Sequence, residues 1–189
     1  MNLNYILFYK INQFAGQNKF IDLLFILLAK YMPFIFIFLL ALMWFRNNNI
    51  YKNIILCAIY SSILGLIFNF IISLLYYHPR PFVIHLGHCL INHSADSSFP
   101  SDHATFMLSI AVELFLFSKT RKIALLLLVL GMVGGFSRVF CGIHFPFDII
   151  GSMIIAVISA VIIFMLKDQL TFLNRIIISH FLEIKSKIN

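Results

Sequence analysis

The stretch Phe99-Pro100-Ser101-Asp102-His103 separates a polar loop, roughly residues 85–98, from a long apolar run. Its proline is typical of a position at or just outside the first turn of a helix, and its serine or aspartate can cap that helix. N–H groups at a helix start carry partial positive charge and bind anions, phosphate above all. A histidine at the same end can give or take a proton. The stretch is therefore either a plain helix cap or the edge of a phosphate site.

The composition is that of a membrane protein. The chain has 189 residues, of which 61% are hydrophobic and only 11% are charged. Its mean hydropathy is +0.97, and a soluble domain is typically about 25% charged. These values predict one polytopic membrane domain over residues 1–189. Nucleic acid is excluded as a partner, because the basic residues do not cluster on a soluble surface.

The apolar runs predict an all-α membrane bundle of about five to six spanning helices, since a span needs roughly 20 residues. Residues 1–18 are predicted to form an interfacial helix with Leu3, Ile6, Leu7, Ile11 and Phe14 on one side. Residues 20–166 hold the core spans, and residues 167–189 form a basic amphipathic tail. The spans are expected at 20–45, 54–77, 104–117, 123–139 and 147–166.

Three features of individual spans are also predicted. Lys30 and Pro33 interrupt the first span, which is expected to be kinked or split in two. Lys30 and Glu113 are expected at similar depths, with opposite charges, and are predicted to pair inside the membrane. The alternative is that Lys30 extends to the interface at a break near Pro33 while Glu113 reaches the cytoplasmic edge.

The distribution of Lys and Arg predicts the orientation, because cytoplasmic loops of membrane proteins are rich in both. All the motif segments then face the extracytoplasmic side. The opposite, cytoplasmic side receives the basic links and tail, with Arg46, Lys52, Lys119, Arg121, Lys122, Lys167, Arg175, Lys185 and Lys187.

Two further motifs stand at the ends of apolar runs. Arg80-Pro81 follows the second run, and Ser137-Arg138 ends the fourth, followed by His144 and Asp148. Arginine offers forked donors to phosphate oxygens, although a lone arginine at a bilayer edge can simply extend to the interface. A carboxylate four residues from a histidine can fix its tautomer and free the other ring nitrogen for attack. The alternative for that pair is an ion pair at a helix start.

Taken together, the three motifs resemble the type 2 phosphatidic acid phosphatase superfamily. The family pattern is Lys-x6-Arg-Pro, then Pro-Ser-x-His, then Ser-Arg-x5-His-x3-Asp, and the second and third parts match here at every defined position. Residues 78–82, His-Pro-Arg-Pro-Phe, together with Asp102, look like the undecaprenyl pyrophosphate phosphatase branch, the bacitracin-resistance type. The resemblance covers roughly residues 20–166.

The resemblance implies a mechanism and a set of site residues. His144 would be the nucleophile that forms a phosphohistidine, oriented by Asp148. His103 would protonate the leaving oxygen and then activate water. The phosphoryl group would be held by Arg80, Ser101, the backbone around Asp102, and Arg138. Neither a metal nor another cofactor is implied.

The first motif departs from the family pattern at Ser73, where the family has lysine. This position lies two turns before Arg80, on the same helical face, so one phosphate-facing cation is missing. His78 is expected to substitute for it in part. The spacing of His85, His88 and His93 does not place them on one face of a helix. A solvated loop is therefore favoured over a metal site.

The predicted function is hydrolysis of undecaprenyl pyrophosphate to undecaprenyl phosphate and phosphate on the extracytoplasmic face of the bacterial plasma membrane. That reaction would recycle the carrier lipid for cell-wall synthesis. Phosphatidylglycerophosphate or another lipid phosphate is an alternative substrate. The non-enzymatic alternative is a small anion transporter or channel, which needs charged residues along the whole crossing.

Overall fold

The computed structural model describes residues 3–46 and 49–188, without the side chains of residues 46, 184, 185, 187 and 188. The predicted features that lie outside the described residues are the first two residues of the interfacial helix, the middle of the link after Arg46, the final residue, and the side chains of Arg46, Lys185 and Lys187. The elements are α1 (Leu3–Asn12), α2 (Lys19–Arg46), α3 (Asn49–Leu75), η1 (Pro81–Ile84), α4 (Asp102–Leu116), α5 (Arg121–Phe140), α6 (Pro146–Met165) and α7 (Lys167–Ile188).

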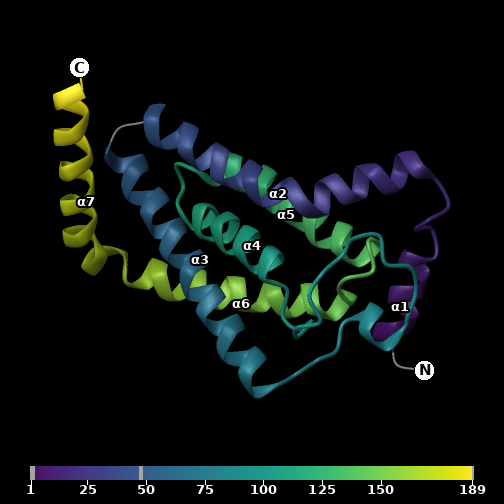
Figure 1. Cartoon of the computed structure of the whole chain (residues 1–189). Helices are drawn as coiled ribbons and strands as arrows, with labels where there is room; N and C mark the ends of the chain where they lie inside the picture. Colours follow the sequence, from purple (N-terminus) through teal and green to yellow (C-terminus); the bar gives the residue numbers. More distant parts are fainter. Residues whose placement is uncertain (1–2, 47–48, 189) are drawn as a thin grey trace.

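The described chain is a helical bundle, as the apolar runs predicted (Figure 1). Four of its helices are long and apolar enough to cross a membrane: α2, α3, α5 and α6. The helix α2 runs unbroken through Pro33, so of the two predicted alternatives, a kink or a split, the split is excluded. The helix α4 covers most of the predicted span at 104–117, but its 15 residues rise only about 22 Å, less than the roughly 30 Å of a hydrocarbon core.

The short helix α4 forms the centre of the bundle and packs against α3, α5 and α6 (Figure 1). Small residues allow this close packing. A side-chain carbon at Gly65 of α3 would lie 2.8 Å from Ser109 Oγ of α4, and one at Gly134 of α5 would lie 2.7 Å from a methyl carbon of Met107. Because its neighbours enclose it, α4 carries the residues at its start into the interior of the protein.

The N-terminal helix α1 is held against the bundle by a face different from the predicted one. Its buried residues are Asn4, Phe8 and Asn12, whereas Leu3 is 58% exposed. The Asn12 side chain donates to the backbone oxygens of His88 and Phe140, both at 2.8 Å, and accepts the His88 N–H at 2.6 Å. Apolar periodicity missed this face because asparagines that satisfy loop backbone groups form much of it.

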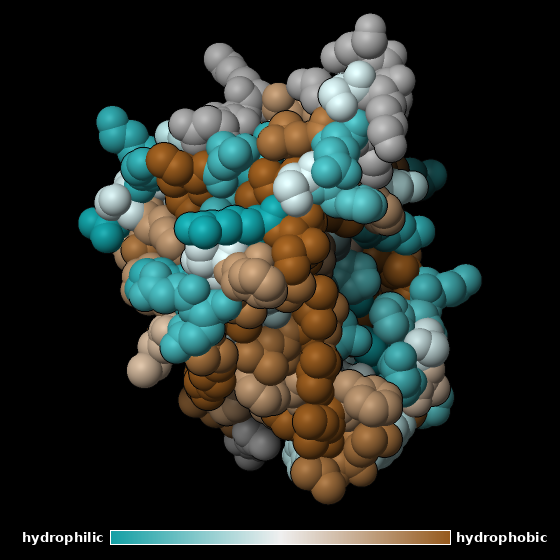
Figure 2. Space-filling view, turned by 90° about the vertical axis from the view of Figure 1, so that its left-hand side faces the viewer, coloured by the Kyte–Doolittle hydropathy of each residue, from teal (hydrophilic) through white to brown (hydrophobic). Residues whose placement is uncertain are grey.

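The amphipathic helix α7 crosses the end of the bundle at a steep angle to α6 (Figure 1). Its buried Asn174 accepts a hydrogen bond from the Tyr60 hydroxyl at 2.9 Å and donates one to Asn53, which fastens α7 to α3. Figure 2 looks onto this end, where hydrophilic residues lie mainly across the middle and sides and hydrophobic residues fill the lower centre.

The predicted Lys30–Glu113 pair is absent from the described residues. Glu113 is completely buried, and neither carboxylate oxygen has a hydrogen-bond partner. Its electrostatic partner is Lys167, whereas Lys30 is exposed and interacts with Cys141 near the opposite end of the bundle. The two residues differ in depth because α4 is short, so that Glu113 lies close to the α7 end.

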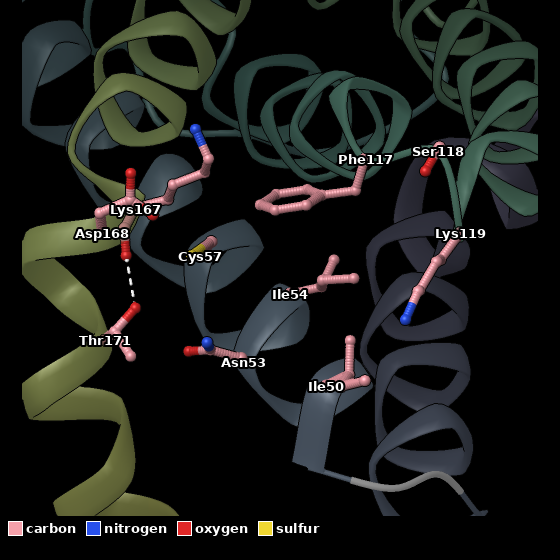
Figure 3. Close-up of a pocket in the computed structure, with 10 residues that line it drawn as sticks. All are labelled: Ile50, Asn53, Ile54, Cys57, Phe117, Ser118, Lys119, Lys167, Asp168 and Thr171. Carbon is pink, nitrogen blue, oxygen red and sulfur yellow. Dashed lines mark hydrogen bonds between the residues drawn. The ribbon is translucent and has the colours of Figure 1, made fainter.

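A pocket of about 290 Å³ lies at the α7 end (Figure 3). Its walls come from the start of α3, the link between α4 and α5, and the start of α7. Lys119 and Lys167 stand on different sides of it, and Cys57 lies on α3 between them. This pocket and the motif residues are at opposite ends of α4, since Phe117 lines the pocket and Ser101 precedes the first turn.

Candidate active site

The three motifs meet at one end of the bundle because each lies at a helix boundary on that side. Arg80 follows α3, residues 101–103 begin α4, Arg138 lies in the last turn of α5, and the residues 144–148 lead into α6. The chain reverses direction between these helices, so segments far apart in sequence come side by side (Figure 1). Arg80, Arg138, His144 and Asp148 are all at most 5% exposed.

The imidazole of His144 is held from both sides. Its Nδ1 atom lies 2.9 Å from the backbone oxygen of Ser98 and 3.3 Å from Asp148 Oδ2. Its Nε2 atom lies 3.1 Å from Nη1 of Arg80. Because a guanidinium only donates, Nε2 accepts and the proton is on Nδ1. Burial, reinforced by the positive charges of Arg138 and Arg80, lowers the pKa of His144 to about 3, although the Asp148 hydrogen bond opposes the shift.

The Asp148 carboxylate both orients His144 and caps α6. Its Oδ2 atom accepts the backbone N–H of Phe145 at 2.7 Å, a capping-box contact at the helix start. The same oxygen accepts the Ser98 hydroxyl. Its Oδ1 atom lies 3.5 Å from Nδ1 of His78. The sequence left two interpretations of Asp148 open, a partner that orients His144 or an ion pair at a helix start. In the structure Asp148 contacts His144 and also lies at the start of α6.

Arg80 is positioned by backbone and side-chain acceptors. It donates from Nη1 to the oxygen of Ile143 at 2.9 Å, from Nη2 to the oxygen of Ser97 at 3.3 Å, and from Nε to Asp96 at 2.8 Å. Burial raises the pKa of Asp96, but hydrogen bonds from Ser94 and Arg80 outweigh it and leave the pKa below its ordinary value. Asp96 is therefore an anion at neutral pH and partly neutralises Arg80.

Arg138 extends from the last turn of α5 toward the loop that precedes α4. It donates from Nη1 to the oxygen of Ala29 at 3.2 Å, and its Nη2 lies 3.3 Å from Nε2 of His93. Its Nε is buried without a hydrogen-bond partner. His93 therefore reaches the site, contrary to the prediction of a solvated loop for all three loop histidines. The positive charges of Arg80 and Arg138 help to lower its pKa, after burial, which is the larger cause.

The start of α4 is not capped by a side chain. Ser101 occupies the N-cap position without a capping hydrogen bond, and its hydroxyl oxygen is buried with no partner. The backbone N–H of Ser101 is held by Ser152 of α6 at 2.9 Å. The Asp102 carboxylate is turned to Asn69 of α3 at 2.8 Å. The plain helix-cap interpretation is therefore wrong, and the donors of the first turn stay available to an anion.

His103 is partly buried in the first turn of α4, where it interacts electrostatically with Arg138, His93 and Arg80. His103 therefore lies near both arginines of the site.

A pocket of about 350 Å³ opens beside these residues and is lined by Arg80, Asp96, Asp102 and Ser73, among others. Ser73 stands where the family has lysine, and its hydroxyl donates to the backbone oxygen of Phe70 at 2.8 Å. His78, which was expected to replace that lysine in part, instead faces Asp148 and packs against Phe145. The pocket wall therefore carries a small neutral residue at this position.

Sequence patterns did not reveal Ser98, Asn69 or Ser152 as parts of the site. Each acts through contacts over 33 residues or more along the chain: Ser98 with Asp148, Asn69 with Asp102, and Ser152 with Ser101. The sequence indicated these residues only by their closeness to the motifs: Ser98 lies three residues before Ser101, and Ser152 lies four residues after Asp148.

The chain is similar to several known proteins. The Undecaprenyl-diphosphatase BcrC of Bacillus subtilis (strain 168) is 36% identical over 168 residues, which cover 89% of this chain and 86% of that protein. The Bacitracin transport permease protein BcrC of Bacillus licheniformis is 29% identical over 93% of this chain and 86% of its own length. The crystal structure of Aquifex aeolicus LpxE has the same fold, with a TM-score of 0.73, 23% identity, and coverage of 87% of this chain and 96% of that one.

A family model for the PAP2 superfamily matches residues 54–172, more than half of the chain. The match contains all three motifs and the helices α4, α5 and α6 that position them. The chain thus belongs to the PAP2 superfamily and is a multi-pass membrane phosphatase.

Proposed function

We propose that this phosphatase hydrolyses undecaprenyl pyrophosphate to undecaprenyl phosphate and inorganic phosphate at the extracytoplasmic surface of the bacterial plasma membrane. The reaction would return the carrier lipid to cell-wall synthesis. The observation that carries the proposal is the paired contact of His144, with Nδ1 held by Ser98 and Asp148 and Nε2 facing Arg80. The name of the 36%-identical relative supports the choice of substrate.

In the first step, Nε2 of His144 attacks the terminal phosphorus in line with the bond to the bridging oxygen. The new N–P bond forms as that P–O bond breaks, and protonated His103 gives its proton to the leaving undecaprenyl phosphate. Arg80, Arg138, the Ser101 hydroxyl and the uncapped N–H groups of α4 stabilise the charge on the transferred phosphoryl oxygens.

In the second step, His103 takes a proton from water as the water oxygen attacks the phosphohistidine. The N–P bond breaks, phosphate leaves, and His144 returns to its neutral form with the proton on Nδ1. Asp148 and the Ser98 carbonyl stabilise the positive charge that the imidazole carries while it is phosphorylated.

The distribution of positive charge supports the proposed side of the membrane. Lys119, Arg121, Lys122 and Lys167 lie at the links and helix starts of the α7 end, opposite to the motif residues. Cytoplasmic ends are rich in Lys and Arg, so the site end would face outward.

The name of the Bacillus licheniformis relative describes a transport permease, which is the class of the anion-transporter alternative. A continuous anion path would need polar groups along the bundle. In the described residues, the buried positions of α4 between the two ends are apolar except for Thr105, Ser109 and Glu113, and none of these three carries a positive charge that would bind an anion. This core separates the cationic site from the pocket at the α7 end.

The proposal is tested with purified protein in detergent and a panel of lipid phosphates: undecaprenyl pyrophosphate, undecaprenyl phosphate, phosphatidylglycerophosphate and phosphatidic acid. We expect phosphate release with the highest kcat/KM on undecaprenyl pyrophosphate. A preference for phosphatidylglycerophosphate would replace the proposed substrate, and the absence of phosphate release from every lipid would reject the proposal.

A further inference from the structure

Two adjoining pockets at the α7 end are lined by three cationic side chains. The first, of about 290 Å³, has Lys119 of the link between α4 and α5 on one side and Lys167 of α7 on the other (Figure 3). The second, of about 450 Å³, is lined by Arg175 of α7. Asn53 of α3 and Thr171 of α7 line both pockets, which therefore adjoin along these two residues.

The three cations keep donors that the protein itself does not use. In the part of the chain that the structure describes, no carboxylate forms a salt bridge with any of them. The Lys167 ammonium donates to the oxygen of Phe164 at 3.4 Å and lies 4.2 Å from the centre of its ring. An ammonium has three donors, so Lys167 can still bind an anion. Arg121 is different, because its Nε donates to the oxygen of Phe115 at 3.4 Å and its guanidinium covers that ring.

Two carboxylates lie near these cations and offset only part of their charge. Asp168 lines the first pocket, but it is exposed in the first turn of α7, where the helix dipole favours an anion. Glu113 attracts Lys167 electrostatically but is completely buried and lines neither pocket. The lining itself therefore carries three positive charges and one negative charge.

The rest of the lining combines a hydrogen-bond donor with apolar side chains. Asn174 donates to the amide oxygen of Asn53, which leaves the Asn53 amide nitrogen as the donor for a ligand. Ile50 lines both pockets, Phe117 lines the first and Leu182 the second. A free phosphate ion would use only the donors, whereas a phospholipid would also place its glycerol and acyl groups against the apolar side chains. The mixed lining therefore favours a phospholipid.

The helix α7 places these pockets at the level of lipid head groups. It crosses the end of the bundle at a steep angle to α6 (Figure 1). Two of its apolar side chains point away from the protein, since Phe172 is 75% exposed and Ile176 is 50% exposed. A helix that combines basic residues with an exposed apolar face, and lies across the ends of spanning helices, is typical of the membrane interface.

We propose that the two pockets bind the head group of an anionic phospholipid, with its phosphate between Lys119 and Lys167 and its outer part near Arg175. Basic pockets between helices at a membrane surface are suited to such head groups. The site is separate from the catalytic pocket, which lies at the opposite end of α4, and the bound lipid is a phosphodiester that stays intact. Because it contacts α3, α7 and the link between α4 and α5, the lipid joins these segments and stabilises the fold.

Two lysines three residues apart provide a matched pair of variants. Lys119 and Lys122 are both exposed, but Lys122 lines neither pocket. Lys119→Gln and Lys122→Gln remove the same charge from the same end of the protein, and both should fold. Arg175→Gln, also at an exposed position, tests the second pocket. Lys167 is left unchanged because it is the electrostatic partner of the buried Glu113.

The test measures the dissociation constant of phosphatidylglycerol by native mass spectrometry of the full chain in neutral detergent. Phosphatidylcholine is the lipid without net charge, and inorganic phosphate and glycerol 3-phosphate are the soluble phosphates. We expect phosphatidylglycerol to bind most tightly. Lys119→Gln and Arg175→Gln should each weaken its binding about fivefold, the usual share of one cation at an anionic membrane surface. Lys122→Gln should leave it unchanged.

Three outcomes of these titrations would overturn the proposal. Equal losses in Lys119→Gln and Lys122→Gln would show attraction to surface charge without a defined site. Equal affinity for phosphatidylglycerol and phosphatidylcholine would show that the phosphate charge is not recognised. Binding of a soluble phosphate as tight as that of the lipid, and weakened by the same variants, would make the ligand a soluble anion.

Thermal unfolding in detergent tests the stabilising effect of the lipid independently of the titrations. Added phosphatidylglycerol should raise the melting temperature of the unaltered protein and of Lys122→Gln, because a ligand that binds only the folded state stabilises it. The rise should be smaller in Lys119→Gln at the same lipid concentration. Equal rises in all three proteins would contradict a site beside Lys119.

Discussion

Nε2 of His144 lies 3.1 Å from the Nη1 atom of Arg80, so a guanidinium donor faces the lone pair that would attack phosphorus. The same Nη1 atom donates to the oxygen of Ile143 at 2.9 Å. A bound phosphoryl group would accept hydrogen bonds from Arg80 in place of His144, which would leave Nε2 of His144 free. The substrate anion would therefore release its own nucleophile, while the Nδ1 contacts keep the ring oriented.

The two histidines assigned to chemistry should each be essential. We expect His144→Ala to abolish turnover, and His103→Ala to lower kcat by about 10²–10⁴-fold, the usual contribution of a positioned proton donor. Phosphate release and acid-labile phosphoprotein are the readouts, and His180→Ala on α7, whose side chain is 78% exposed, is the control. Near-full activity in His144→Ala would reject the phosphohistidine mechanism.

Ser98 should act as a positioning residue through Asp148. Removing its hydroxyl in Ser98→Ala leaves one hydrogen bond of a buried carboxylate unmade. A hydrogen bond to a charged group is worth about 1.5–3 kcal/mol, so kcat should fall roughly 10- to 100-fold with little change in KM. A purely structural role would lower thermal stability without this selective fall in kcat. Each loss of kcat converts to an increase in activation free energy. In the double mutant with Asp148→Asn this increase should be smaller than the sum of the two single increases, because the two residues share one contact.

A lysine restored at position 73 should strengthen phosphate binding. Ser73 lines the same pocket as Arg80, and a cation on that wall would gain about 1 kcal/mol from a bound anion in partial solvent. Ser73→Lys should therefore lower the inhibition constant of vanadate or phosphate about fivefold. Ser73→Gln, of similar reach without charge, is the control. An unchanged constant in the lysine variant would show that this wall does not face the bound phosphoryl group.

The buried His144 should make stability depend on pH. Burial lowers its pKa to about 3 from 6.5, so between these values the unfolded chain binds a proton that the folded chain does not. Stability should rise with pH across this window and fall as the solution becomes more acidic, by at most about 1.4 kcal/mol per pH unit for one group. Melting temperatures of His144→Ala in detergent from pH 4.5 to 6.5 should show a flatter slope, in contrast to His180→Ala. Parallel slopes in all three proteins would contradict a neutral buried His144.

Cysteine labelling tests the orientation. Cys89 is exposed in the loop before α4, whereas Cys57 and Cys141 are buried. In intact cells a membrane-impermeant maleimide should react with Cys89, and Cys89→Ser should remove the signal. A cysteine placed at Lys119, in the link between α4 and α5, should react only after the cells are opened. The reverse pattern would put the site in the cytoplasm.

The sequence by itself determined the membrane class, the helical bundle and the motif residues. Long apolar runs identify spans because hydrophobicity is a local property, and the motif residues Arg80, Arg138, His144 and Asp148 were identified by their fixed spacing along the chain. The close approach of those four residues also followed from chain reversal, since each stands at a helix boundary on the same side.

Only the tertiary structure decided how the site is supported and how deep Glu113 lies. Ser98, Asn69 and His93 reach the site through contacts between segments 33 to 50 residues apart, and no periodicity records such contacts. The depth of Glu113 depended on the short length and central position of α4, which hydropathy does not reveal.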